Sequence, residues 1–341
     1  MASNDTLERM PHLRVAVISG GTSSEHDVSL SSGKMVMAHL DAKRYAVESV
    51  RIGKDGRWRF SRLSRRLDVG ESFQELRRRR FDVAFIALHG PFGEDGHMQA
   101  LLESIRLPYT GSGVLASALA MDKEKTNVFA RSAGLEVPSF LAFDARRWRV
   151  DRRGVLADVH EMGTFPVVVK PVCGGSSAGV FLARNETHFA AAVRNILHSG
   201  ERVLIQAYVR GTEFTCGVIE DEHGCPFALP PTKILPRSAA FYTYQAKYKT
   251  GGSLHEVPAN IPPGLAHGIQ GFALRIHLAL GCRGMSRSDF ILKDGSFHFL
   301  ETNTIPGMTQ TSLLPEAAAA IGLPFPALLD RLVRSALHSY V

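Results

Sequence analysis

The sequence predicts a multidomain α/β protein, and three observations support this. The chain has 341 residues, which is more than one simple hydrophobic core usually accommodates. In its first third, short apolar runs alternate with segments of helical periodicity, as in a parallel sheet covered by helices. From about residue 114 onward, strands occur in neighbouring pairs between helices, which indicates α+β units.

The first third contains two predicted buried strands, each followed by a helix. Residues 14–19 (RVAVIS) form the first apolar run, and a helix is expected over about 31–40. Residues 81–88 (FDVAFIAL) form the second run, followed by a helix over 97–106. The glycine-rich stretch 110–113 (TGSG) predicts a hinge or domain boundary.

The middle of the chain is expected to form an α+β unit, and residues 1–13 a disordered tail. The predicted elements of the middle part are two helices (114–120 and 122–133), a long polar loop with five arginines (146–153), two strands flanking a glycine-serine loop (166–169 and 179–183), a helix (186–198) and a strand (203–207).

The last third adds a further α+β unit without any internal repeat. The predicted elements are a strand (213–219), a glycine- and tyrosine-bearing segment (237–258), a long helix (264–280), a hairpin (288–301) and C-terminal helices.

The net charge of +7 does not indicate a nucleic-acid-binding protein. Such a protein should gather basic and aromatic residues on one face, whereas the arginines here are scattered. The single run, Arg77 to Arg80, is interpreted as a solvated helix end, where cations suit the helix dipole. A nucleotide or a small carboxylate is an equally suitable anionic partner.

Four cysteines show no C-x-x-C spacing and no paired framework, and no apolar stretch resembles a signal sequence or a membrane span. We therefore expect a reduced, cytoplasmic protein that needs no membrane.

The loop KPVCGGSSAGV (170–180) admits two interpretations. It lacks the lysine-plus-hydroxyl ending of a Walker loop, since Lys170 precedes the glycines. Because strands flank it on both sides, a bound phosphate would meet backbone N–H groups without a helix dipole. Taken alone, the loop is more typical of a tight turn than of a phosphate site.

The segment GGTSSEHDVS (20–29) follows the first strand but lacks the G-x-G-x-x-G dinucleotide fingerprint. Ligands of open α/β sheets bind at the carboxyl ends of strands, which is where this loop lies. Glu25 could bind a cationic amine there, or it could be an ordinary solvated glutamate.

The C-terminal hairpin carries the strongest local signal. Asp289 opens one strand and Glu301 ends the next, so both carboxylates approach each other across an antiparallel pair. A three-residue connection with Gly295 in a left-handed conformation would place them on one face, whereas a strict two-residue loop would not. With Asn303 they form an all-oxygen set that suits Mg²⁺. An acidic hairpin edge is the alternative.

Two lysines are further candidates. Lys123 begins a predicted helix and Lys170 ends a strand just before the glycine-serine loop. Each alone would usually be a surface lysine, but a nucleotide site needs such cations facing its phosphates.

Together these segments resemble the D-alanine–D-alanine ligases of the ATP-grasp superfamily. The resemblance runs from about residue 14 to the C-terminus, in the family's order and with similar spacing. Its motifs are GGTSSEHDVS (20–29), ALHGPFGEDG (87–96), PYTGSGVLASALAMDK (108–123), VKPVCGGSSAGV (169–180), AKY (246–248), RSD (287–289) and ETNTIPGMT (301–309).

The resemblance implies a three-domain ATP-grasp architecture, in which an N-terminal parallel-sheet domain (14–111) precedes two α+β domains (112–207 and 208–341) that sandwich ATP. It implies ligation of two D-alanine molecules through a D-alanyl phosphate, giving D-Ala-D-Ala, ADP and phosphate for peptidoglycan synthesis. The cofactors would be ATP and two Mg²⁺ ions, with Mn²⁺ as an alternative, and the assembly a homodimer.

The resemblance also implies roles for individual residues. The nucleotide-binding residues would be Lys123, Lys170, Ser177, Gln206, Ala207, Val209, Glu213 and Lys247. The metal ligands would be Asp289, Glu301 and Asn303. The catalytic residues would be Glu25, Ser176, Tyr248, Arg287 and Gly307, with Ser176, Tyr248 and Glu25 holding a lid formed by 175–177. The substrate-binding residues would be Glu25, His89, Arg287, Gly307, Ser312 and Leu313.

The sequence departs from the family pattern in a few places. Residues 172–174 (VCG) replace a charged or amide residue, which puts lid kinetics in doubt. Gln206 stands where a glutamate is common near the adenine amino group, so we expect weaker nucleotide affinity. His26 and Ser288 also differ, without an evident consequence.

Two alternatives stay open within the superfamily: a ligase joining D-alanine to D-lactate or D-serine, and another carboxylate–amine ligase. Tyr248 favours the dipeptide-forming type. Outside the superfamily, an oxidoreductase would need the missing dinucleotide fingerprint.

Overall fold

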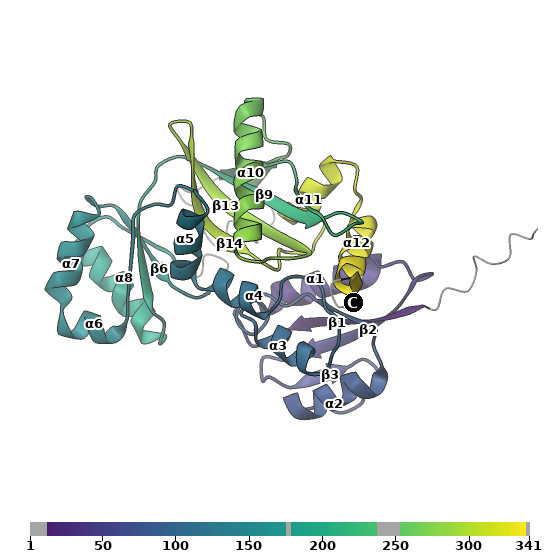
Figure 1. Ribbon diagram of the computed structural model, residues 1–341. Helices are drawn as coiled ribbons and strands as arrows, with labels where there is room; N and C mark the ends of the chain where they lie inside the picture. Colours follow the sequence, from purple (N-terminus) through teal and green to yellow (C-terminus); the bar gives the residue numbers. More distant parts are fainter. Residues whose placement is uncertain (1–11, 175–178, 237–252, 339–341) are drawn as a thin grey trace, which may run out of the picture.

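The computed structural model describes residues 12–174, 179–236 and 253–338, and these ranges contain three β-sheets (Figure 1). The predicted tail therefore lies almost entirely outside the described residues. Within these ranges, no single helix is long and apolar enough to span a bilayer. The last two helices pass that test only as a pair, bent by 105°.

The first sheet has the strand order β3-β2-β1-β4, with β1 parallel to both β2 and β4 and with β3 antiparallel. Its elements are β1 (Leu13–Gly20), α1 (His26–His39), β2 (Tyr45–Ile52), β3 (Trp58–Phe60), α2 (Val69–Arg79), β4 (Val83–Ile86) and α3 (His97–Ser104). The strands predicted at 14–19 and 81–88 are present as β1 and β4, although β4 is shorter than predicted. The helix expected at 31–40 begins earlier, at His26, and β2 and β3 were not predicted.

The second sheet is four-stranded and antiparallel, in the order β5-β8-β6-β7. Its elements are β5 (Phe140–Phe143), α6 (Ala145–Val150), α7 (Arg152–Glu161), β6 (Val167–Pro171), β7 (Phe181–Ala183), α8 (Glu186–His198) and β8 (Val203–Ala207). The glycine-serine loop thus joins two antiparallel strands, as predicted, and α8 and β8 have the expected bounds.

The prediction of a long arginine-rich loop over 146–153 is wrong, because two short helices occupy this stretch. Asp144 accepts a hydrogen bond from the Arg147 N–H and caps α6, and Asp151 does the same for Gly154 and α7. Aspartate at these cap positions satisfies N–H groups that lack a partner within the helix, and arginine is a good helix former.

The third sheet is six-stranded and antiparallel, in the order β12-β11-β9-β13-β14 with β10 beside β9. Its strands are β9 (Thr212–Glu220), β10 (Pro226–Ala228), β11 (Thr232–Pro236), β12 (Ser253–Glu256), β13 (Met285–Lys293) and β14 (Ser296–Asn303). The remaining helices of the chain are α4 (Val114–Met121), α5 (Lys123–Ser132), α10 (Pro263–Ala279), α11 (Leu313–Ala320) and α12 (Phe325–His338).

The alternation along β9 separates the two faces of this sheet. Phe214, Cys216 and Val218 share a core with α4, α5 and α10. Gly217 points the other way, where an added Cβ would lie 2.5 Å from the Leu314 side chain of α11. Glycine at this position therefore lets α11 approach the sheet closely, which matters for the site described below.

Both ends of the described chain contribute to one core. The buried residues of the first sheet pack together with Leu328, Leu332 and other apolar side chains of α12. At the edge of this contact, the Tyr45 hydroxyl donates to Asp330, which also pairs with Arg44 at 2.6 Å.

The predicted domain boundaries at 111/112 and 207/208 remain predictions. The helices α4 and α5 share their core with the third sheet.

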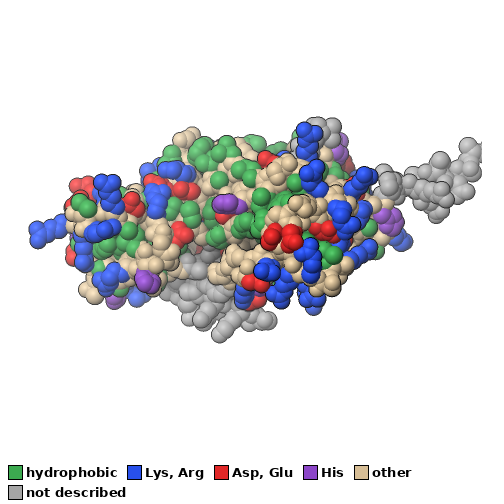
Figure 2. All heavy atoms as spheres, turned by 90° about the horizontal axis from the view of Figure 1, so that it is seen from below, with side chains coloured by type: hydrophobic (Ala, Val, Ile, Leu, Met, Phe, Trp, Pro, Cys, Tyr) green, Lys and Arg blue, Asp and Glu red, His purple; other side chains and the backbone are tan. Residues whose placement is uncertain are grey.

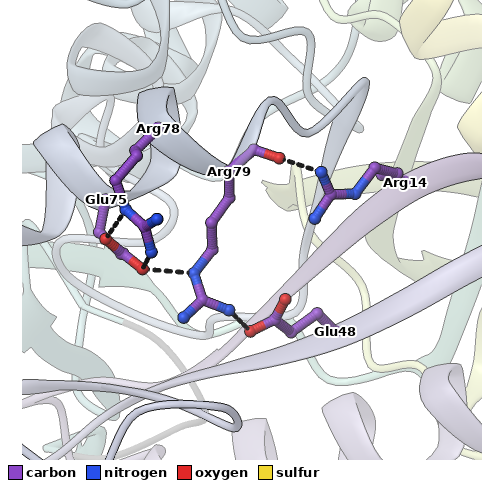
Figure 3. A network of polar contacts seen from close by, with 5 residues as sticks. All are labelled: Arg14, Glu48, Glu75, Arg78 and Arg79. Atoms are coloured by element: carbon purple, nitrogen blue, oxygen red, sulfur yellow. Dashed lines mark hydrogen bonds and ion pairs between the residues drawn. The ribbon is translucent and has the colours of Figure 1, made fainter.

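Arg79 corrects the interpretation of the arginine run as wholly solvated (Figure 3). Its side chain is only 9% exposed and pairs with Glu48 of β2 and, at 2.6 Å, with Glu75 of α2. Arg14 donates to the Arg79 carbonyl, while Arg78 remains exposed and pairs with Glu75 at 2.7 Å. One buried ion pair, Arg79–Glu48, and one hydrogen bond, from Arg14, thus hold the last turn of α2 against the sheet.

Charged side chains on one face of the molecule are dispersed among other types. On the face drawn in Figure 2, lysine and arginine side chains are interspersed with acidic and apolar ones. This distribution agrees with the scattered arginines of the sequence.

Candidate active site

A cavity of about 540 Å³ is lined by residues that are distant in the sequence. The chain segments around it are the loops after β1 and β4, the junction of α4 and α5, the strands β9 and β11–β14, and the segment leading into α11. The predicted site residues that line it are Glu25, His89, Lys123, Glu213, Arg287, Asp289, Glu301, Asn303, Gly307, Ser312 and Leu313.

The other predicted site residues lie elsewhere. Lys170 on β6 and Gln206 on β8 are buried within the second sheet and do not line this cavity, nor do Ala207 and Val209. The Gln206 side-chain nitrogen finds no hydrogen-bond partner among the described residues. The predictions for Ser176, Ser177, Lys247 and Tyr248 fall outside the described residues.

The two hairpin carboxylates lie on one face, although the turn by itself does not place them there. The turn between β13 and β14 is a two-residue loop, Asp294–Gly295, with both φ angles positive (49° and 83°). Of the two connections considered from the sequence, the two-residue loop is therefore the one observed. Leu300 is an extra residue in β14, so that the pairing shifts from Phe290–Phe299 to Asp289–Glu301.

Contacts around the carboxylates hold them in place. Arg287 donates to both oxygens of Asp289, each at 3.0 Å, and the Thr215 hydroxyl donates to the same carboxylate at 2.6 Å. Lys123 lies with its Nζ 3.7 Å from an oxygen of Glu301. At the hairpin, the charge of each carboxylate is therefore compensated by a neighbouring cation, Arg287 for Asp289 and Lys123 for Glu301.

The chemistry of this donor set fits a hard cation. Asp289, Glu301 and Asn303 offer only oxygen atoms, and the Asn303 carbonyl accepts one hydrogen bond, from the Ile305 N–H at 3.1 Å. Within the described ranges no three His, Cys, Asp or Glu side chains come together as a closed metal site. Two carboxylates and one amide suit Mg²⁺, which usually takes its remaining ligands from water and substrate phosphates.

Lys123 links the carboxylates to the glycine-serine loop. Its ammonium group donates to the Gly174 carbonyl, and its backbone N–H donates to the Val172 carbonyl at 3.1 Å. Asp122 caps α5 just before it by accepting from Lys125. A cation that is only 7% exposed is therefore fixed where the loop begins.

Among the residues that line the cavity, Glu25 lies beside two buried titratable groups. Burial lowers the pKa of His89 to about 4, and its Nε2 lies 2.9 Å from the Ser32 hydroxyl. Burial raises the pKa of Glu94 to about 8, and the neighbouring charge of Glu25 adds to the rise. Glu94 accepts from the Gly90 N–H at 2.6 Å. Sequence reasoning missed Glu94, although its motif had been singled out.

The start of α11 also lines the cavity. Ser312 precedes the helix and accepts from the Thr309 N–H at 3.0 Å, and Gly307 is close enough that an added Cβ would lie 2.9 Å from the Ser312 hydroxyl. His255 of β12 also lines the cavity and pairs with Glu316 of α11 at 2.7 Å. His255 was not predicted, because nothing in the sequence placed β12 beside α11.

Comparison with known proteins identifies the family. Residues 14–112 match the model of the D-ala D-ala ligase N-terminus, and residues 129–334 match that of the C-terminus. A D-alanine--D-alanine ligase from Rhizobium meliloti is 44% identical over 334 residues, covering 96% of this chain and 99% of its own.

Solved structures agree. The D-alanine--D-alanine ligase from Bacillus anthracis complexed with ATP has a TM-score of 0.78 and 31% identity, covering 97% of this chain and 99% of its own. The VanG D-Ala:D-Ser ligase from Enterococcus faecalis has a TM-score of 0.81 and 28% identity, covering 97% of this chain and 100% of its own. The chain is therefore a member of the D-alanine–D-alanine ligase family with the ATP-grasp fold.

Proposed function

We propose that the protein joins two D-alanine molecules at the expense of ATP, giving D-Ala-D-Ala, ADP and phosphate for peptidoglycan precursors. The observation that carries the proposal is the arrangement of the cavity. One cavity gathers Glu25, which would bind an amine, the residues at the N-terminus of α11, and the cations Lys123 and Arg287 with the carboxylates of Asp289 and Glu301.

The first D-alanine would bind beside Glu25. Glu25 would hold its ammonium group, and the neutral His89 beside it would add a hydrogen bond without a second charge. The substrate carboxylate would attack the γ-phosphorus of ATP and form a D-alanyl phosphate. Lys123 would offset the charge of the transferring group, as expected for phosphoryl transfer.

The nucleotide would lie between the second and third sheets. Lys123 and Lys170 would face its phosphates, residues 206–209 its adenine and Glu213 its ribose. Asp289, Glu301 and Asn303 would hold two Mg²⁺ ions, with Mn²⁺ as an alternative. Bound there, the metal would neutralise charge on the phosphates. The roles of Ser176, Ser177, Lys247 and Tyr248 remain predictions.

The second D-alanine would bind at the N-terminus of α11. Its carboxylate would meet the Ser312 hydroxyl and the Leu313 N–H, where the helix dipole favours an anion. Its amine would attack the acyl phosphate carbon, and Arg287 with the Gly307 N–H would stabilise the resulting oxyanion, each donor contributing roughly 3 kcal/mol. Phosphate would then leave.

A substrate panel tests this proposal. The enzyme with ATP and Mg²⁺ should release phosphate on addition of D-alanine and give a product with the mass of D-Ala-D-Ala. It should prefer D-alanine over equimolar D-lactate between about pH 7 and 9, where an α-amine with a pKa of about 8 is increasingly deprotonated. A predominant mixed ester at pH 7 or a D-Ala-D-Ser product would indicate the alternative ligases.

We further propose that the protein works as a cytoplasmic homodimer without nucleic-acid or membrane partners. The absence of a single membrane-spanning helix among the described residues is compatible with this. Sedimentation of the purified enzyme should give about twice the monomer mass of 37.3 kDa.

A further inference from the structure

We propose that His255 positions the second D-alanine by pairing with Glu316, so that the Glu316 carboxylate does not compete for the N-terminus of α11. The inference rests on the proposed function, since it concerns the subsite assigned above to the second substrate's carboxylate.

Glu316 lies where its carboxylate could compete with the substrate carboxylate. Glu316 lies in the first turn of α11, and its side chain is 25% exposed. A carboxylate at this point is attracted to the same N–H groups and the same dipole that would bind the substrate carboxylate. An unpaired Glu316 would therefore either fold back onto the helix start or repel the incoming anion.

His255 removes this competition through its geometry. It comes from β12, and its Nδ1 lies 2.7 Å from a Glu316 oxygen. Its side chain is 19% exposed and lines the same cavity as Ser312 and Leu313. The imidazole thus draws the Glu316 carboxylate toward β12 and leaves the start of α11 to the substrate.

The neighbouring charges have other partners. Glu256, next along β12, points to the opposite face of the strand and pairs with Lys233 of β11 at 3.8 Å. Across the cavity, Arg287 is held by Asp289 at 3.0 Å. Neither Lys233 nor Arg287 is paired with Glu316, and among the described residues it is the His255 ring that contacts the Glu316 carboxylate.

A double-mutant cycle tests this role. His255→Phe removes the partner while Glu316 keeps its charge, and we expect the KM for the second D-alanine to rise about three- to tenfold. The KM for ATP and the turnover at saturating D-alanine should stay within about twofold, because neither depends on an anion at the start of α11. In His255→Phe/Glu316→Gln, the KM for the second D-alanine should return to within about twofold of the wild-type value.

Two readouts separate the subsites. Phosphate release as a function of D-alanine concentration gives separate constants for the two D-alanine sites. Hydroxylamine trapping reports the first half-reaction alone, because hydroxylamine attacks the D-alanyl phosphate, releases phosphate and gives a D-alanine hydroxamate. Hydroxamate formation at low D-alanine should be the same in the wild type and in His255→Phe.

The matched control is His160→Phe. His160 of α7 pairs with Glu186 at 3.1 Å away from the cavity lining, so its loss should leave every constant unchanged. If His255→Phe does not change the second KM, or if Glu316→Gln does not restore it, the pair does not position the substrate. If the wild-type enzyme forms neither hydroxamate nor D-Ala-D-Ala, the proposed function itself fails.

Discussion

Asp289 and Glu301 lie directly opposite each other on β13 and β14, although the turn that joins these strands would by itself place Glu301 opposite Ser288. The additional residue Leu300 shifts the register by one. A one-residue shift moves side chains to the other face of a sheet, so Leu300 brings Glu301 to the cavity face that Asp289 and Arg287 occupy. The bulge is thus a functional part of the hairpin.

The paired carboxylates should be required for turnover. Asp289→Asn and Glu301→Gln should each reduce kcat by at least about a hundredfold while the protein stays folded, because the phosphate charge would no longer be neutralised. Steady-state kinetics across a Mg²⁺ titration, together with circular dichroism, would check this. Near-normal turnover at saturating Mg²⁺ would contradict the assignment.

Gln206 should allow the enzyme to use nucleotides with either adenine or hypoxanthine as the base. A glutamine can present either its carbonyl or its amide N–H₂ to a ligand, whereas a glutamate only accepts. Gln206→Glu should lower the KM for ATP a few-fold and reduce the relative use of ITP, whose 6-oxo group needs a donor. The measurement is kcat/KM for both nucleotides. An unchanged ATP/ITP ratio would remove Gln206 from the adenine pocket.

The ion pairs of Figure 3 should contribute to stability as a unit. Arg79→Met leaves Glu48 buried without its partner, and breaking such a pair costs about 3–5 kcal/mol. Arg79→Met/Glu48→Leu should recover a large part of this loss, since the unpaired charge is gone. Urea unfolding of both variants tests this, with Arg78→Met as the exposed control.

The buried side chain of His277 should lower the free energy of unfolding as the pH falls below about 6.5. Burial lowers the pKa of His277 to about 4, and the ring contacts Ser286 at 2.7 Å. A histidine with a depressed pKa favours the folded state above its unfolded pKa of about 6.5, and this contribution is lost as the pH falls toward 4. Burial also lowers the pKa of His89, so its contribution to stability is lost over the same direction of pH change.

His277→Leu/Ser286→Ala should therefore flatten the loss of stability between pH 6.5 and 4, removing up to about 3 kcal/mol of pH dependence. The free energy of unfolding, measured in urea at several pH values, gives the slope. An identical slope in the wild type and the variant would show that His277 does not titrate in this range.

The sequence patterns predicted elements such as α8 and β8 correctly, because the residues that determine these elements lie within them. The helix at 186–198 and the strand at 203–207 have the predicted bounds. The arginines of α6 and α7 were interpreted as a loop from their polarity, and the caps Asp144 and Asp151 were not recognised. Leu300 could not be recognised as a bulge, since an extra residue becomes visible only when its partner strand is known.

The site was predictable where a motif marks it and not where distant elements create it. Asp289, Glu301 and Lys123 were found because their spacing and positions suggest chemistry, and they line the same cavity. His255 and Glu94 acquire their roles from neighbours far along the chain, Glu316 and Glu25. No window of sequence contains both members of either pair.

The packing of α12 on the first sheet also constrains the order in which the protein can fold during synthesis. The strands of the first sheet leave the ribosome well before α12, yet their core includes Leu328, Leu332 and Val333 of that helix. A nascent chain therefore exposes an incomplete apolar surface until α12 has been made. We expect this surface to be a binding site for chaperones, and removal of α12 to leave a chain that depends on them.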